Sequence, residues 1–339
     1  MMEKRLGKQT VKFSKAVSLL STAAVAGQKE GEGPLASHFD IIMENSEWGE
    51  DTWEKAESKM QRMAVGRALE KAKVDAKDVK YIFAGDLLNQ CISSTFGLMA
   101  FDIPFLGVYG ACSTMAETMG LAAMSIDGGY GDLSVAVTSS HFCTAERQYR
   151  NPLEYGGQRT PTAQWTVTGS GAVVLSESGN GPYITHFTSG KVVDLGVKDA
   201  NNMGAAMAPA AADTLAAHFE DTGRNPDFYD LIVTGDLGTV GKSIIVDLMR
   251  EKGFDVGGNY DDCGCMIFDV QKQDMHAGGS GCGCGAITLC GYIMDRIRAG
   301  ELKNVLFMGT GALLSPTSTL QGESIPSVAH AVAISAERE

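Results

Sequence analysis

The sequence contains no hydrophobic run that is long enough to span a membrane. A transmembrane helix needs about 20 consecutive apolar residues. The partly apolar stretch 16–27 is shorter, carries serine and threonine, and has no clear cleavage signature. We therefore expect a soluble protein without a secretory signal.

Positive charge is also scarce in this chain. The 28 lysines and arginines are outnumbered by 41 aspartates and glutamates, which leaves a net charge of -13 at pH 7. A protein that binds nucleic acid needs a basic face to meet the phosphates. The composition therefore argues against nucleic acid as a partner.

Cysteine is too sparse for a small scaffold held together by disulfides, because there are eight cysteines in 339 residues. Small secreted domains carry cysteine at a far higher density. We therefore expect reduced thiols in the cytosol, in a chain that forms one large domain or two medium ones.

Four of the cysteines form two Cys-Gly-Cys pairs, Cys263 with Cys265 and Cys282 with Cys284. Four thiolates could hold zinc, but zinc sites usually have two residues between paired cysteines rather than one. At the start of a helix, Cys282 and Cys284 would also point to nearly opposite faces. We therefore favour a packing role for these pairs, and we expect neither a metal nor a cofactor.

The chain is organised around residues 104–126, where a cysteine stands at the entrance of a helix. The apolar run 104–109 predicts a buried strand, and apolar residues at helical spacing follow Cys112. Thr114 and Glu117 predict a capping box. Free backbone N–H groups at a helix start favour a thiolate or a bound anion. The alternative is a small buried thiol that fills the turn.

The remaining pattern alternates strands with helices. Residues 14–33 are small and polar and predict a loop near a ligand or partner, and residues 142–164 predict a long polar excursion. The other predicted elements are a helix over 51–73, a helix or covering segment over 89–101, and strands over 79–84, 133–138 and 166–176.

The second part of the chain repeats the first. The segment KYIFAGDL at 80–87 is echoed by DLIVTGDL at 230–237, and the spacing from Cys112 to Val135 equals that from Cys282 to Val305. Self-similarity over so long a period, with strands alternating with helices, predicts two related α/β halves rather than a solenoid. We place these halves at residues 1–180 and 181–339.

Two duplicated α/β halves, with a cysteine at a helix entrance in the first, resemble the thiolase and β-ketoacyl synthase superfamily. The resemblance covers nearly the whole chain. It implies a five-layer αβαβα fold and usually a homodimer.

A narrower resemblance is carried by four long segments, AGDLLNQ, YGACSTMAE, SSHFCTAERQYRNPLEYGGQRTPTAQWTVTGSGAVVL and VTGDLGTVGKSI. They are similar to the stage V sporulation protein AD family. That resemblance implies a protein of spore-forming bacteria that binds dipicolinic acid. It also implies that the protein acts together with membrane proteins that transport this compound. The protein would then lie on the cytoplasmic side of the spore inner membrane.

The catalytic members of the superfamily pair their cysteine with histidine and with a second histidine, asparagine or cysteine. Such partners activate the thiol and hold the oxyanion of the thioester. Here Asp236 stands where a histidine would, Ser280 ends the turn that would carry asparagine, and Thr310 lies in the loop that would carry a second cysteine. We therefore expect no condensing or thiolytic activity.

A dianionic ligand needs donors for both carboxylates. His141 follows a strand that should end near Cys112, and three arginines lie in the polar excursion after it. Asp236 would oppose an anion, so we expect it to orient His141, an arginine or a bridging cation. The expected ligand-binding residues are Cys112, His141, Arg147, Arg150, Arg159, Asp236, Gly279, Ser280 and Thr310.

Three functions stay open at this point. The first is binding of dipicolinic acid without catalysis, in support of its transport into the spore and its release at germination. The second is an active acyltransferase that uses Cys112 on a thioester, and the third is a structural adaptor for a membrane complex. Whether calcium accompanies the ligand also stays open.

Overall fold

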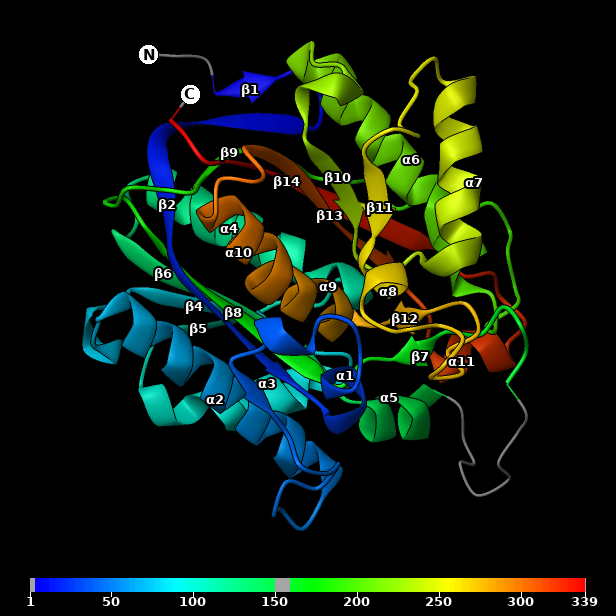
Figure 1. Ribbon diagram of the computed structural model, residues 1–339, viewed down its shortest axis with the longest axis horizontal. Coiled ribbons are helices and arrows are strands. Elements are labelled where there is room, and N and C mark those ends of the chain that lie inside the picture. The colour runs from blue at the N-terminus through cyan, green and yellow to red at the C-terminus, as the bar shows by residue number, and fades with distance from the viewer. Residues whose placement is uncertain (1–3, 150–158, 339) are drawn as a thin grey trace.

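A computed structural model describes residues 4–149 and 159–338 of the chain. Its main sheet has twelve strands, ten of which follow one continuous path (Figure 1). The first five on one side of the path are β2 (Thr10–Ala26), β8 (Gly169–Ser176), β6 (Leu133–Ser140), β4 (Tyr81–Gly85) and β5 (Phe105–Gly107), in that spatial order. The other five are β9 (Tyr183–Thr188), β14 (Ser327–Ser335), β13 (Asn304–Ala312), β10 (Leu231–Thr234) and β11 (Tyr260–Asp262).

The two groups of five strands have the same order and the same directions. In the first group β4 is parallel to β5 and β6, and β8 is antiparallel to β6 and β2. In the second group β10 is likewise parallel to β11 and β13, and β14 is antiparallel to β13 and β9. β2 and β9, the first strand of each group, pair antiparallel and join the groups. The short strands are β1 (Arg5–Leu6) and β3 (Ile41–Ile42), which pair with β2, and β7 (Trp165–Thr166), which pairs with β12 (Gly279–Ser280).

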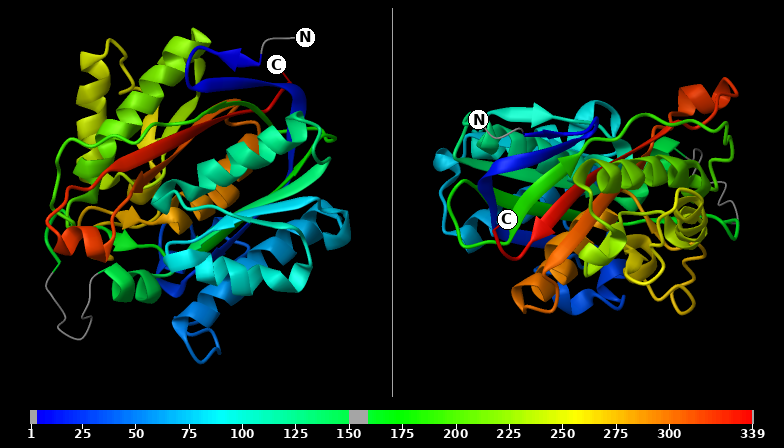
Figure 2. Two further views of the ribbon diagram at one scale, coloured as in Figure 1. Left: turned by 180° about the vertical axis from the view of Figure 1, so that it is seen from behind. Right: turned by 90° about the horizontal axis from the view of Figure 1, so that it is seen from above.

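Helices form three layers around the two groups of strands (Figures 1 and 2). α4 (Thr114–Asp127) and α9 (Cys282–Thr288) lie in the middle and contact strands of both groups. The outer helices are α2 (Trp53–Ala72) and α3 (Ile92–Leu98) on one side, and α6 (Met203–Thr222) and α7 (Gly238–Glu251) on the other. The predicted five-layer αβαβα fold of duplicated halves is therefore confirmed.

The shorter helices connect these layers. α9 continues through a π-helical turn, Leu289–Ile293, into α10 (Met294–Arg298). The others are α1 (Gln28–Gly31), α5 (Phe142–Tyr149), α8 (Cys263–Met266) and α11 (Pro316–Leu320). Among the residues described, no helix is long and apolar enough to cross a membrane.

Two local predictions are wrong. Residues 14–26 form most of β2 instead of a loop, because a strand buried on both faces shows no alternation of polar and apolar residues. β5 is an exposed edge strand rather than a buried one. The excursion 142–164 begins with α5, whose side chains line the site described below.

The predicted capping box at the start of α4 is also absent. Ser113 is the capping residue and makes no side-chain hydrogen bond to the helix, because a 3-10 turn at Ala111–Ser113 leads into it. The Thr114 hydroxyl instead donates to the carbonyl of Ala111 at 2.6 Å.

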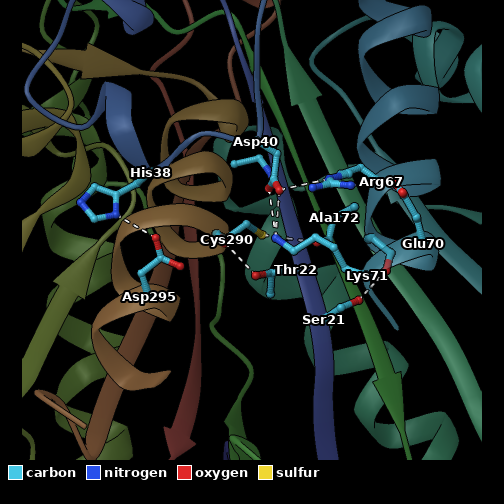
Figure 3. A network of polar contacts seen from close by, with 12 residues as sticks. Ser21, Thr22, His38, Asp40, Arg67, Glu70, Lys71, Ala172, Cys290 and Asp295 are labelled. Atoms are coloured by element: carbon cyan, nitrogen blue, oxygen red, sulfur yellow. Dashed lines mark hydrogen bonds and ion pairs between the residues drawn. The ribbon is translucent and has the colours of Figure 1, made fainter. Parts of the chain in front are cut away.

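A polar network fixes the segment that follows β2 between the outer and middle layers (Figure 3). The Asp40 carboxylate accepts hydrogen bonds from the backbone N–H of Ala24 at 3.0 Å and from Lys71 of α2 at 3.0 Å. His38 pairs with Asp295 of α10 at 2.8 Å. The segment that carries His38 and Asp40 is thus tied both to α2 and to α10.

Candidate functional site

Cys112 lies in the 3-10 turn that precedes α4, directly against β13. Ala111 adopts a left-handed conformation with φ of 50° at this turn. Two glycines of β13 allow the close approach: a Cβ at Gly311 would lie 2.2 Å from the carbonyl oxygen of Gly110, and one at Gly309 would lie 2.6 Å from that of Ser113. The two glycines of this strand therefore allow the turn that carries Cys112 to pack directly on β13.

Asp236 follows β10 and is fully buried beside the cysteine. Its carboxylate accepts hydrogen bonds from the Thr310 hydroxyl at 2.7 Å, from the Gly281 N–H at 2.8 Å and from the Ser280 hydroxyl at 3.3 Å. The structure thus brings together Cys112, Asp236, Ser280 and Thr310, four of the residues expected from the sequence. Gly279 lies next to Ser280 in the short strand β12.

Of the two alternatives for Cys112, the neutral thiol is favoured. Burial raises the pKa of the Cys112 thiol well above its ordinary value, and the neighbouring Asp236 and Cys282 raise it further. Burial also raises the pKa of Asp236, to about 6, against the lowering effect of its hydrogen bonds. At neutral pH the pair is therefore a neutral thiol beside a mostly ionised carboxyl group. The start of α4, which favours negative charge, does not outweigh the effect of burial and Asp236 on the thiol.

A narrow cavity of about 60 Å³ opens beside Cys112. Its lining includes apolar side chains such as Met203 and Leu314, and also Tyr149 and Glu146 of α5. The Tyr149 hydroxyl donates to the Leu87 carbonyl at 2.6 Å. Tyr109, whose hydroxyl lies 2.7 Å from that of Tyr149, also lines the cavity.

Sequence reasoning did not single out Glu146 and Tyr149. They lie three residues apart, and so on one face of the short helix α5. Their helical spacing was present in the sequence, but we described this segment only as a long polar excursion. Glu146 accepts a hydrogen bond from Thr166 at 3.1 Å, which ties α5 to β7.

His141 does not come to Cys112, contrary to our expectation. Its Nε2 lies 2.9 Å from the Ser46 carbonyl oxygen, and its Nδ1 accepts from the Cys143 N–H at 3.2 Å. The chain turns into α5 immediately after His141, and this turn directs the ring toward the loop after β3. None of the six histidines, all within the described part of the chain, lines the Cys112 cavity.

The arginines are also engaged elsewhere. Arg147 forms an ion pair with Glu54 and stacks over the Trp53 ring, and Arg159 donates to the Asp274 carbonyl at 2.5 Å. Neither lines the cavity, and Arg150 lies outside the described residues. Asp236 therefore orients neither His141 nor one of the described arginines, because its carboxylate accepts its hydrogen bonds from Thr310, Ser280 and the Gly281 backbone.

The duplication places a second cysteine and a second aspartate in related positions. Cys282 begins α9 and donates to the Ser139 carbonyl at 2.8 Å, and Asp86 follows β4 as Asp236 follows β10. Asp86 is capped by the backbone N–H groups of Leu88 and Ser94. Burial raises the pKa of the Cys282 thiol, and the carboxyl groups of Glu57 and Asp86 raise it further. Because both carboxyl groups are buried, this second location is a buried acidic cluster.

The fold and the position of the cysteine define a protein of the thiolase-like class. Two solved structures share the fold with TM-scores of 0.57 and 0.60: 3-oxoacyl-[acyl-carrier-protein] synthase III from Aquifex aeolicus VF5 and Xanthomonas campestris OleA E117Q. The first is 13% identical and covers 94% of this chain and 100% of its own. The second is 14% identical and covers 95% and 99%.

The chain belongs to the stage V sporulation protein AD family, whose sequence profile matches residues 7–335. It is 47% identical to the stage V sporulation protein AD of Bacillus subtilis (strain 168) over 329 residues, which cover 97% of each chain. Both resemblances noted from the sequence are thereby confirmed.

Proposed function

We propose that this protein binds dipicolinic acid without chemical turnover, in support of its transport into the developing spore and its release at germination. The observation that carries this proposal is the position of the half-buried Cys112 thiol beside the buried Asp236 carboxyl group, which raises the pKa of the thiol. Acyl transfer needs a thiolate and donors for an oxyanion. A carboxylate raises the pKa of the thiol and repels an oxyanion, so the site fits binding better than catalysis.

The cavity suits a flat ring with polar groups at its edge. Tyr109 and Tyr149 offer aromatic surface, and the hydroxyls of Ser280 and Thr166 offer hydrogen bonds. A rigid ligand loses little conformational freedom on binding. Membership in a sporulation family supports dipicolinate as that ligand.

The charge of the ligand must be balanced within the cavity. Among the described residues, no lysine, arginine or histidine lines it, whereas Glu146 does and Asp236 lies behind Cys112 and Ser280. Calcium prefers carboxylate oxygens. We therefore include calcium in the proposal, carried by dipicolinate, whose ring nitrogen and carboxylates can chelate it.

The protein itself offers no complete calcium site. No group of three or more histidine, cysteine, aspartate or glutamate side chains in residues 4–149 and 159–338 could hold a metal ion. In the proposed complex the ligand therefore supplies most of the coordination, and Glu146 is placed to add an oxygen.

Titration calorimetry tests the site. We expect the calcium chelate of dipicolinate to bind the parent protein, Cys112→Ala to weaken binding by less than about tenfold, and Cys112→Trp to abolish it by filling the cavity. Cys265→Ala, which changes a half-buried cysteine away from the cavity, is the matched control. Equal binding by the parent and Cys112→Trp would place the ligand elsewhere.

The competing function is acyl transfer from a thioester. Incubation with acetyl-CoA and short acyl-CoAs, followed by mass spectrometry of the intact protein, distinguishes the two. We expect no adduct on Cys112 and no release of CoA above background. Rapid stoichiometric acylation of Cys112 would establish an enzyme. If the protein is neither acylated nor able to bind dipicolinate, the structural adaptor is the remaining function.

A further inference from the structure

Gln164 is a buried glutamine that joins two turns of the Cys112 site without reaching the cavity. It lies directly before β7, is 2% exposed and does not line the cavity. Its Nε2 donates one hydrogen bond to the backbone carbonyl of Asp236 at 2.8 Å and a second to the backbone carbonyl of Gly279 at 2.7 Å. One side-chain nitrogen therefore connects the turn after β10 with β12.

The backbone on either side of Gln164 is fixed by the same neighbouring segment. The Ala277 N–H donates to the Ala163 carbonyl at 3.0 Å, and the Trp165 N–H donates to the Gly278 carbonyl at 2.8 Å. β7 and β12 then continue as a parallel pair. The side chain of Gln164 thus starts from a backbone position that is held on both sides.

The turn after β10 is held through two kinds of backbone group. Asp262 of β11 accepts hydrogen bonds from the N–H groups of Leu237 at 2.8 Å and Gly238 at 2.9 Å. Gln164 binds the carbonyl that precedes them, at Asp236. The turn also packs closely on the glutamine, because a Cβ at Gly238 would lie 2.8 Å from its Nε2.

The chemistry of the contact explains why an amide serves here. Two buried carbonyl oxygens need two donors from nearly the same point, and the NH₂ group of glutamine supplies both without charge. A lysine at this position would bury an ammonium group, which is costly. The Oε1 of Gln164 has no hydrogen-bond partner among the described residues, so its polar contacts here are the two that Nε2 makes.

We propose that Gln164 is a positioning residue of the Cys112 site, which holds the turn of Asp236 against the turn of Ser280 and so keeps the Asp236 carboxyl group beside the thiol. The same two turns meet again at that carboxylate, which accepts from the Gly281 N–H at 2.8 Å and from the Ser280 hydroxyl at 3.3 Å. The effect of Gln164 on Cys112 therefore passes through Asp236. This role deepens the proposed function and rests on it only for the identity of the ligand.

The alkylation rate of Cys112 measures this role, because the thiolate reacts and the thiol does not. We expect Gln164→Met, which keeps the length of the side chain without its donors, to release the turn of Asp236. The rate with iodoacetamide at pH 7.5 should rise by about threefold or more, and the pH profile of the rate should shift down by about half a pKa unit. Gln273→Met is the matched control, because Gln273 also hydrogen-bonds two backbone groups, neither of them in a turn of the site.

A double-mutant cycle separates positioning from a general loosening of the fold. In an Asp236→Asn background, Gln164→Met should not accelerate alkylation further, because the carboxylate through which Gln164 acts is gone. Equal acceleration in both backgrounds, or a rate like that of Gln273→Met, would overturn the role. If Gln164→Met does not fold, Gln164→Asn, whose amide is one methylene shorter, replaces it and should give a smaller acceleration in the same direction, with the same two outcomes against the role.

Titration calorimetry of the parent with the calcium chelate of dipicolinate keeps this role distinct from the proposed function. The expected alkylation rates together with no binding of the chelate would overturn the proposed function and support the positioning role. Binding of the chelate together with an alkylation rate that Gln164→Met leaves unchanged would overturn the positioning role and support the proposed function.

Discussion

Cys112 shows that the same side chain can receive opposite influences from its helix and from its neighbours. The start of α4 favours negative charge, but burial and Asp236 raise the pKa of the thiol. The balance between these two effects on the pKa of the thiol decides whether Cys112 is a nucleophile, and in this protein the neutral thiol is favoured.

Replacement of the neighbouring carboxyl group tests this account at Cys112. We expect Asp236→Asn to lower the pKa of the thiol and to accelerate its alkylation at pH 7.5 by about tenfold, the effect of one pKa unit on the thiolate fraction. The measurement is mass spectrometry of the iodoacetamide adduct over time. Asp230→Asn is the control and should leave the rate unchanged, because Asp230 is exposed and lies just before β10, the strand that Asp236 follows. A rate unaltered by Asp236→Asn would contradict the electrostatic explanation.

At the scale of the element, Glu57 links helices to a strand through its buried carboxyl group. It accepts hydrogen bonds from Ser139 of β6 and Thr144 of α5, each at 2.8 Å. Burial, with a contribution from Asp86, raises the pKa of Glu57 to about 8. The protonated form is therefore favoured in the folded protein.

The sign of the resulting pH dependence follows from linkage. In the unfolded chain Glu57 ionises near its ordinary pKa of 4.5, whereas in the folded protein it stays protonated to about pH 8. Its contribution to stability is thus fully present below pH 4.5 and is lost as the pH rises to 8.

We expect Glu57→Gln to remove part of this dependence. The parent should lose on the order of 1–3 kcal/mol more unfolding free energy than the variant between pH 5 and pH 8. Urea denaturation at both pH values measures it. Glu70→Gln, on the exposed face of the same helix, is the control. Parallel losses in Glu57→Gln and the parent would show that Glu57 is not the group responsible.

For the whole molecule, the resemblance to the superfamily implies a homodimer, and β5 offers a surface for it. β5 pairs with β4 on one side, and within the described residues its other side has no partner strand. Leu106 of β5 is 44% exposed, and Phe96 of α3 and the following Met99 are 60% and 70% exposed. An uncovered apolar edge strand invites pairing with a second copy.

Sedimentation velocity tests this dimer. We expect the parent to sediment as a dimer and Leu106→Lys combined with Phe96→Asp to sediment as a monomer, because charge would be buried without a partner. Leu320→Lys changes a residue that is 88% exposed on α11 and is the control. A dimer that survives the double change would place the interface elsewhere.

Association with the membrane is the second prediction at this scale. From the resemblance to the sporulation family, we expect contact with the spore inner membrane to go through membrane proteins of the same transport system. In flotation assays the isolated protein should not bind liposomes that contain only lipid. Tight binding to such liposomes would contradict this.

The sequence by itself determined the duplicated α/β architecture and the family. The Gly-Asp-Leu turns after β4 and β10 and the periodicity of α2 and α4 are local patterns, and each was readable from adjacent residues. The sequence also placed Asp236, Ser280 and Thr310 with Cys112, through the resemblance of their segments to known turns.

Only the tertiary structure decided which side chains meet. His141 and Arg159 were expected at Cys112, yet His141 lies against the Ser46 carbonyl and Arg159 donates to the Asp274 carbonyl, away from the Cys112 cavity. β2 has no alternating pattern because it is buried on both faces, so its sequence resembled a loop. The physical reason is the range of the forces involved: periodicity reflects neighbours in the chain, whereas burial, charge and pKa reflect segments that lie more than a hundred residues apart and become adjacent only in the folded protein.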